Sequence, residues 1–121
     1  MNAELLLISV TLGSLGALAR YSIQAWASTS GKGYLGILAA NIVGSALAGA
    51  LFALPDSFTT AAIVAGFCGS LTTLSTMVVH LLPVTGAPPL RSRVGLGLAH
   101  VAGSVGAAFV AYSAVALWLV N

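Results

Sequence analysis

A cluster of polar side chains interrupts an apolar stretch of the chain at residues 66–77, which read GFCGSLTTLSTM. The segment contains two glycines and six hydroxyl or thiol residues, namely Cys68, Ser70, Thr72, Thr73, Ser75 and Thr76. A lipid-facing helix gains nothing from such a cluster, because inside a bilayer irregular backbone persists only where it is buried in protein or lines a polar path. The segment therefore predicts a broken transmembrane helix, and we expect the functional site to lie there.

Two further polar side chains could contact an ion. Arg20 lies within or at the edge of an apolar stretch, where a charged residue usually faces a water-filled cavity or a partner group. The alternative is that its side chain extends to the membrane interface, beside Tyr21 and Trp26. Asn41 is surrounded in the sequence by Ala and Ile, so its amide either bonds a neighbouring helix or donates to a passing anion.

A second polar stripe is formed by His100 and Ser104. These residues are one helical turn apart, so they share a face of the helix that contains them. A single histidine in a membrane helix is commonly a hydrogen-bonded packing residue, and here the adjacent serine also permits a polar track. The spacing alone leaves both interpretations open.

Composition indicates the setting of these residues. Of the 121 residues, 59% are hydrophobic and 5% are charged, whereas a soluble domain carries about a quarter charged residues. Each apolar stretch is close to the roughly 20 residues that cross a bilayer, and the four stretches are about 5–26, 34–54, 59–83 and 94–120. Turn or breaker residues occupy the connections at 28–33, 55–58 and 84–93. The sequence thus predicts an all-α membrane protein whose residues 1–121 form a single integral membrane domain with four helices, the third of them broken.

In the predicted topology, the basic residues all lie on or near one side of the membrane. With four spans, both termini share one side with the connection that contains Asp56, and the opposite side receives Lys32, Arg91 and Arg93, with Arg20 near it. The positive-inside rule places the connections 28–33 and 84–93 in the cytoplasm and both termini outside.

Signatures of an enzyme are absent from the sequence. Glu4 and Asp56 are the only acids and both lie at span ends, so no nucleophile–histidine–acid set and no metal cluster with ligand spacing can be assembled. Cys68 is the only cysteine and can form no intrachain disulfide. A net charge of +2 gives no reason to expect binding of nucleic acid.

Three sequence motifs carry a resemblance to a known family. GSLGALARY in the first span, LAANIVGSALAG in the second and GFCGSLTTLST in the third resemble the signatures of the Fluc/CrcB fluoride channels, and the similarity extends over nearly the whole chain. The resemblance implies a fluoride-selective channel subunit of the bacterial cytoplasmic (inner) membrane. Such a channel exports fluoride passively, lowers cytoplasmic fluoride and so confers fluoride resistance. It also implies an antiparallel, dual-topology dimer with two pores at the subunit interface.

The resemblance further assigns a cofactor and site residues. A structural Na⁺ at the dimer centre would be held by the backbone carbonyls of Gly69 and Thr72, in a turn at 69–73. Arg20 would line a vestibule and Asn41 would face the pore. The polar track of the family corresponds here to His100 and Ser104.

The physical chemistry of fluoride is consistent with these assignments. Because fluoride is small and strongly hydrated, a pore must supply hydrogen-bond donors in place of water. The side chains of Asn41, Ser75, Thr76 and Ser104 can donate. Carbonyl groups at a helix break suit a hard cation, and its charge would favour an anion nearby.

One departure from the family pattern concerns its pore phenylalanines. Family members usually read TTFSTF, whereas this chain has Leu74 and Met77 at those positions, and neither side chain offers the positive edge of an aromatic ring. A protein that inserts in both orientations should also have nearly balanced Lys and Arg on its two sides. We therefore hypothesise one half of a heterodimer, whose partner supplies the phenylalanines, with a homodimer as the alternative.

Two other functions remain open at this point. A small proton-coupled exporter would share the length and the four spans, but it needs a carboxylate within the membrane, and no acid lies within a span. A non-conducting structural subunit is compatible with the missing phenylalanines.

Overall fold

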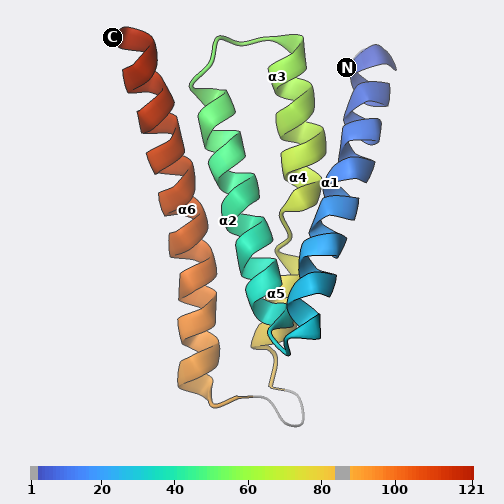
Figure 1. The fold of residues 1–121 in the computed structure, drawn as a ribbon, viewed down its shortest axis with the longest axis vertical. Coiled ribbons are helices and arrows are strands. Elements are labelled where there is room, and N and C mark those ends of the chain that lie inside the picture. The colour runs from blue at the N-terminus through green and yellow to red at the C-terminus, as the bar shows by residue number, and fades with distance from the viewer. Residues whose placement is uncertain (1–2, 84–87) are drawn as a thin grey trace.

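The chain forms four helical spans that run side by side, as predicted from hydropathy (Figure 1). The computed structural model describes residues 3–83 and 88–121, so part of the predicted connection 84–93 lies outside the described residues. Helix α1 spans Ala3–Thr29, α2 spans Gly33–Phe52 and α6 spans Leu90–Val120. The third span, Phe58–Leu81, consists of shorter pieces. The described residues contain no strand, and the ends of the chain lie at the same end of the bundle (Figure 1).

The break in the third span is confirmed, but it lies later than expected. Helix α3 (Phe58–Ala62) continues into the π-helix η1 (Ile63–Cys68) and the single turn α4 (Gly69–Leu71), and helix α5 (Ser75–Leu81) follows the break. Residues 72–74 are not helical, and Thr72 is extended with ψ of 154°. The predicted turn at 69–73 is therefore wrong in its first half, because Gly69–Leu71 are still helical.

Helix α6 begins at Leu90, earlier than the predicted boundary at 94, so Arg91 and Arg93 belong to its first turn and not to a connection. Pro89 precedes the helix with φ of −58°. Proline suits a helix start, because its φ is already helical and the first turn needs no N–H from it. Arg93 Nη1 then donates to the carbonyl of Leu81 over 3.0 Å, which ties the start of α6 to the end of α5.

Small residues allow the helices to approach closely. Helix α2 packs against both α1 and α6, and α1 also contacts η1 and α4 (Figure 1). A methyl group added at Gly49 would overlap the backbone of Ala108 on α6, and one added at Gly16 would overlap the carbonyl of Phe67 on η1. This is the mode of association expected of membrane helices, where packing replaces the hydrophobic effect.

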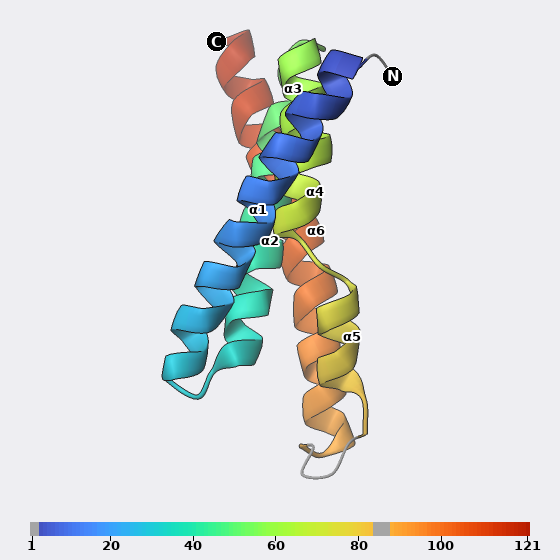
Figure 2. The same ribbon diagram turned by 90° about the vertical axis from the view of Figure 1, so that its right-hand side faces the viewer.

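Most large apolar side chains point out of the bundle. Ile37 and Ala40 are fully buried, but Leu7 is 68% exposed and Trp118 is 76% exposed. In Figure 2, the ends of α1 and α2 nearest their connection diverge from α5 and the first half of α6. An apolar exterior of this extent is that of a multi-pass membrane protein and leaves surface for lipid or for another subunit.

Substituting alanine for Gly49 tests the close contact between α2 and α6. We expect Gly49→Ala to lower the free energy of unfolding by about 1–3 kcal/mol, because the added methyl group forces the helices apart. The measurement is an unfolding titration of the purified protein in mixed micelles. Gly95→Ala is the matched control, since a methyl group there meets nothing within 4 Å. Equal stability of the two variants would contradict this account.

Candidate functional site

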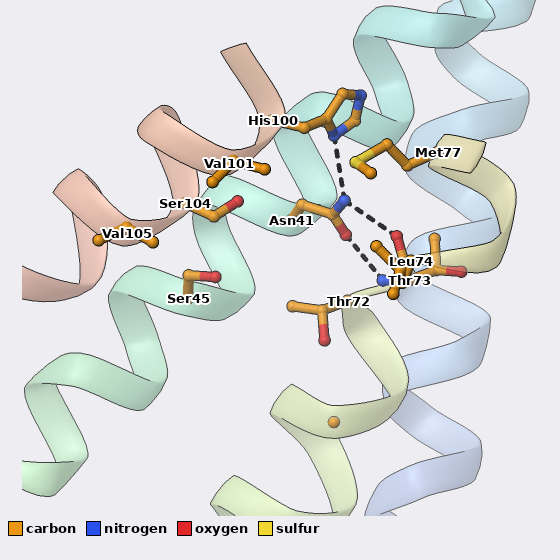
Figure 3. Close-up of a pocket in the computed structure, with 11 residues that line it drawn as sticks. Asn41, Ser45, Thr72, Thr73, Leu74, Met77, His100, Val101, Ser104 and Val105 are labelled. Atoms are coloured by element: carbon orange, nitrogen blue, oxygen red, sulfur yellow. Dashed lines mark hydrogen bonds between the residues drawn. The ribbon is translucent and has the colours of Figure 1, made fainter. Parts of the chain in front are cut away.

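The side-chain amide of Asn41 holds the helix break in place. Its Oδ1 accepts the backbone N–H of Thr73 over 2.7 Å, and its Nδ2 donates to the carbonyl of Thr73 over 3.0 Å (Figure 3). Because a backbone N–H can only donate, the first bond fixes which end of the amide is oxygen. Asn41 on α2 thus provides partners for both polar groups of a residue that has left the helix.

The same amide also reaches α6. Nδ2 of Asn41 lies 3.1 Å from Nδ1 of His100, which is 2% exposed (Figure 3). Both hydrogens of the amide are then in use, so Nδ1 is the acceptor and the neutral imidazole carries its proton on Nε2. Of the two roles considered for Asn41, bonding a neighbouring helix and donating to an anion, the structure shows the first. Nε2 of His100 is buried and has no hydrogen-bond partner among the described residues.

A second group of hydroxyls surrounds the start of α5. Oγ1 of Thr73 lies 3.2 Å from Oγ of Ser75 and 3.3 Å from Oγ1 of Thr76, and it accepts the backbone N–H of Thr76 over 3.4 Å. On the other side of the break, Oγ1 of Thr72 donates to the carbonyl of Cys68 over 3.0 Å. These hydroxyls bind the chain at both edges of the break.

A cavity of about 450 Å³ lies beside the break, between α2, α5 and α6 (Figure 3). Its lining contains seven of the residues expected at the site: Asn41, Gly69, Thr72, Leu74, Met77, His100 and Ser104. The other three, Arg20, Ser75 and Thr76, do not line it. Sequence reasoning missed Ser45 and assigned no role to Thr73, both of which line the cavity. Ser45 could have been found, because it lies one turn after Asn41 on the same face of α2.

The two positions of the family phenylalanines differ in their surroundings. Leu74 is 70% exposed, whereas Met77 is 8% exposed, and both line the cavity. Leu74 is therefore available to a second subunit or to the contents of the cavity, while Met77 packs within its own chain.

Arg20 is a half-buried residue of α1. Its Nη1 lies 3.4 Å from the carbonyl of Thr72. This distance exceeds the usual 2.7–3.2 Å of an N–H···O bond, so the contact is weak. The Arg20 side chain therefore contacts a group inside the protein, the carbonyl of Thr72, and does not extend to the membrane interface.

The carbonyl groups at the break fit a hard cation. The N–H of Thr73 is bound to Asn41, so it does not satisfy the carbonyl of Gly69 as it would in a continuous helix. Among the described residues, the carbonyl of Thr72 has only the weak contact with Arg20. Gly69 and Thr72 line the same cavity. Carbonyl oxygens at the end of a half-helix are the ligands by which membrane proteins hold Na⁺. No cluster of His, Cys, Asp or Glu that could hold a metal occurs in the described part of the chain.

The fold and the site define a class of protein. Four apolar helices with a polar break and a hydroxyl-bearing cavity form a multi-pass membrane protein suited to passing a small polar species. A family model described as "CrcB-like protein, Camphor Resistance (CrcB)" matches residues 7–114, and the chain belongs to this family. The resemblance inferred from the sequence motifs is thereby confirmed.

Several curated proteins are similar to this chain over most of its length. "Fluoride-specific ion channel FluC" of Albidiferax ferrireducens is 36% identical over 114 residues, covering 87% of this chain and 86% of that protein. The protein of the same name from Variovorax paradoxus is 36% identical, with coverages of 82% and 85%. That of Methanopyrus kandleri is 34% identical, with coverages of 84% and 86%. No solved structure matches significantly. These relatives are named as ion channels, in agreement with the prediction that this chain is not an enzyme.

Removing the amide of Asn41 tests its role at the break. We expect Asn41→Leu to lower the free energy of unfolding by about 2 kcal/mol or more, because both polar groups of Thr73 lose their partner. The measurement is the same unfolding titration. Ser45→Ala is the control, since Ser45 lines the same cavity but makes no hydrogen bond within the described structure. If Asn41→Leu were as stable as Ser45→Ala, the break would not depend on Asn41.

Proposed function

We propose that this chain is a subunit of a fluoride-selective channel that lets fluoride leave the cytoplasm passively. The observation that carries the proposal is membership of the CrcB family, with relatives named as fluoride-specific ion channels over more than four fifths of each chain. The cavity at the break supports it, because this is where the chain gathers polar side chains within the membrane.

Two serine hydroxyls give the cavity free donors. Ser45 on α2 and Ser104 on α6 lie on facing helices (Figure 3), and neither makes a hydrogen bond with another described residue. A fluoride ion that loses its hydration shell in a pore requires such hydrogen-bond donors in place of water. Asn41 takes the role of positioning the break, and its bond to His100 fixes the imidazole on the wall of the cavity.

The proposal includes a Na⁺ held by the carbonyls of Gly69 and Thr72, shared with a second subunit. When bound, the cation supplies positive charge beside the cavity, which favours an anion there. The chain contributes the oxygens by ending α4 at Leu71 and by directing the N–H of Thr73 to Asn41.

We propose an antiparallel dimer in the bacterial cytoplasmic membrane, surrounded by lipid. The exposed apolar side chains of α1 and α6 support burial against lipid and another subunit. Leu74 and Met77 replace the aromatic pair of the family, and the basic residues are one-sided, so the proposed partner is a related subunit with the opposite charge bias. The homodimer is the alternative.

The positions of the acids disfavour a proton-coupled exporter. Glu4 lies in the first turn of α1, and Asp56 lies in the connection between α2 and α3. Neither carboxylate is in the middle of a span, where proton exchange would need it. The non-conducting structural subunit remains as an outcome of the efflux experiment below.

Fluoride efflux from liposomes tests the channel and the missing aromatic pair together. We expect the chain alone to release fluoride slowly, and the double variant Leu74→Phe with Met77→Phe to release it at least about tenfold faster, because the positive ring edges stabilise the ion. A fluoride electrode measures the rate. Leu15→Phe with Leu98→Phe, at exposed positions, is the matched control. Absence of efflux in every variant, and with a related subunit added, would favour the structural subunit.

Accessibility of a C-terminal tag tests the fixed orientation. Lys32, Arg91 and Arg93 lie at the end of the bundle opposite both termini (Figure 1), so we expect the tag to be labelled only from outside the cell. Asp56→Lys adds a positive charge at the other end and should produce a mixed population, whereas Asp56→Ser should do so far less. Equal labelling of the unmodified chain from both faces would refute the fixed orientation and favour the homodimer.

A further inference from the structure

The contact between Arg20 and Thr72 joins a permanent cation to a proposed cation ligand. Nη1 of Arg20 lies 3.4 Å from the carbonyl oxygen of Thr72, one of the two oxygens proposed to bind Na⁺. A guanidinium group carries its charge at every accessible pH and can only donate hydrogen bonds. A Na⁺ on the same oxygen would therefore lie within a few ångströms of a like charge, in a half-buried site where screening by solvent is incomplete.

We infer that Arg20 and Na⁺ compete for the Thr72 carbonyl, so that Arg20 sets the affinity of the break for sodium. This inference rests on the sodium site of the proposed function. With no Na⁺ bound, the guanidinium gives the carbonyl of Thr72 a donor in place of the lost helical partner. The bond is long for its type, so the cost of leaving it is small, and Na⁺ binding displaces the side chain.

The displaced guanidinium finds no acid in its own chain. Glu4 lies in the first turn of α1 and Asp56 in the connection between α2 and α3, both toward the end of the bundle that holds the termini (Figure 1). A half-buried cation without a carboxylate takes its counter-ion from solution. Occupation of the carbonyl by Na⁺ thus converts Arg20 from a structural donor into a group that attracts an anion to the break.

A sodium titration of protein stability tests the competition without measuring transport. The melting temperature of the purified chain is measured against NaCl concentration, with ionic strength held constant by N-methyl-D-glucamine chloride, since a ligand of the folded state raises it. We expect the half-saturating Na⁺ concentration of Arg20→Gln to be about tenfold lower than that of the unmodified chain, or lower still, because the like charge is removed. Arg91→Gln removes the same charge at an exposed position in the first turn of α6 and should leave that concentration unchanged.

Two outcomes overturn the inference, and they are distinguishable. An unmodified chain that responds to Na⁺, with an equal or higher half-saturating concentration in Arg20→Gln, refutes the competition and leaves the sodium site standing. No response in any of the proteins, either alone or with a related subunit added, refutes the sodium site and the competition together, and the fluoride efflux experiment then still decides the channel.

A measurement on the unmodified chain covers the case in which Arg20→Gln does not fold. The chain has three arginines, Arg20, Arg91 and Arg93, so the side-chain Nε–H signals of ¹⁵N-arginine-labelled protein can be resolved. We expect the Arg20 signal to shift with Na⁺ along the same curve as the melting temperature, while the Arg91 signal stays in place. A stationary Arg20 signal during a sodium-dependent rise in stability would overturn the competition.

Discussion

The site depends on one hydrogen-bonding constraint. Where a backbone leaves the helix inside a membrane, its N–H and C=O groups need new hydrogen-bond partners within the protein. Asn41 meets it at Thr73 by accepting from its N–H and donating to its carbonyl. An amide is suited to this task, because it is one of the side chains that present a donor and an acceptor side by side. The polar residue in the middle of the second span is thus explained by the irregular backbone in the third.

The same bonds determine which groups remain available for an ion. Asn41 uses both amide hydrogens on Thr73 and His100, so it has none left for an ion, whereas the hydroxyls of Ser45 and Ser104 on the cavity wall remain free to donate. Because the N–H of Thr73 points to Asn41, the carbonyl of Gly69 loses its helical donor. Donors for an anion and oxygens for a cation therefore arise together from one displaced peptide, on the wall of one cavity.

The sequence predicted the spans, because apolar length is a local property, and it predicted a break from the polar cluster at 66–77. It could not place the break at 72–74, since that position depends on an amide from α2 that lies more than thirty residues away in the chain. The glycines suggested an earlier turn, but Gly66 serves close packing against the backbone of Ser9, and Gly69 begins the helical turn α4. The contact between Arg20 and the carbonyl of Thr72 could not be predicted either, because the sequence indicates how deep a residue lies in the membrane but not which group it contacts.

The exposure of Leu74 explains how this chain can form the whole helix break and still need a second subunit to complete the site. Leu74 lies within the break and is 70% exposed, so the wall of the cavity continues onto surface that another subunit can cover. Met77 is buried one turn later and belongs to the interior of its own bundle. Of the two positions that depart from the family pattern, only Leu74 offers a surface on which a partner's aromatic ring can pack without rearranging this chain. A partner's ring can therefore pack on Leu74, whereas Met77 offers it little exposed surface.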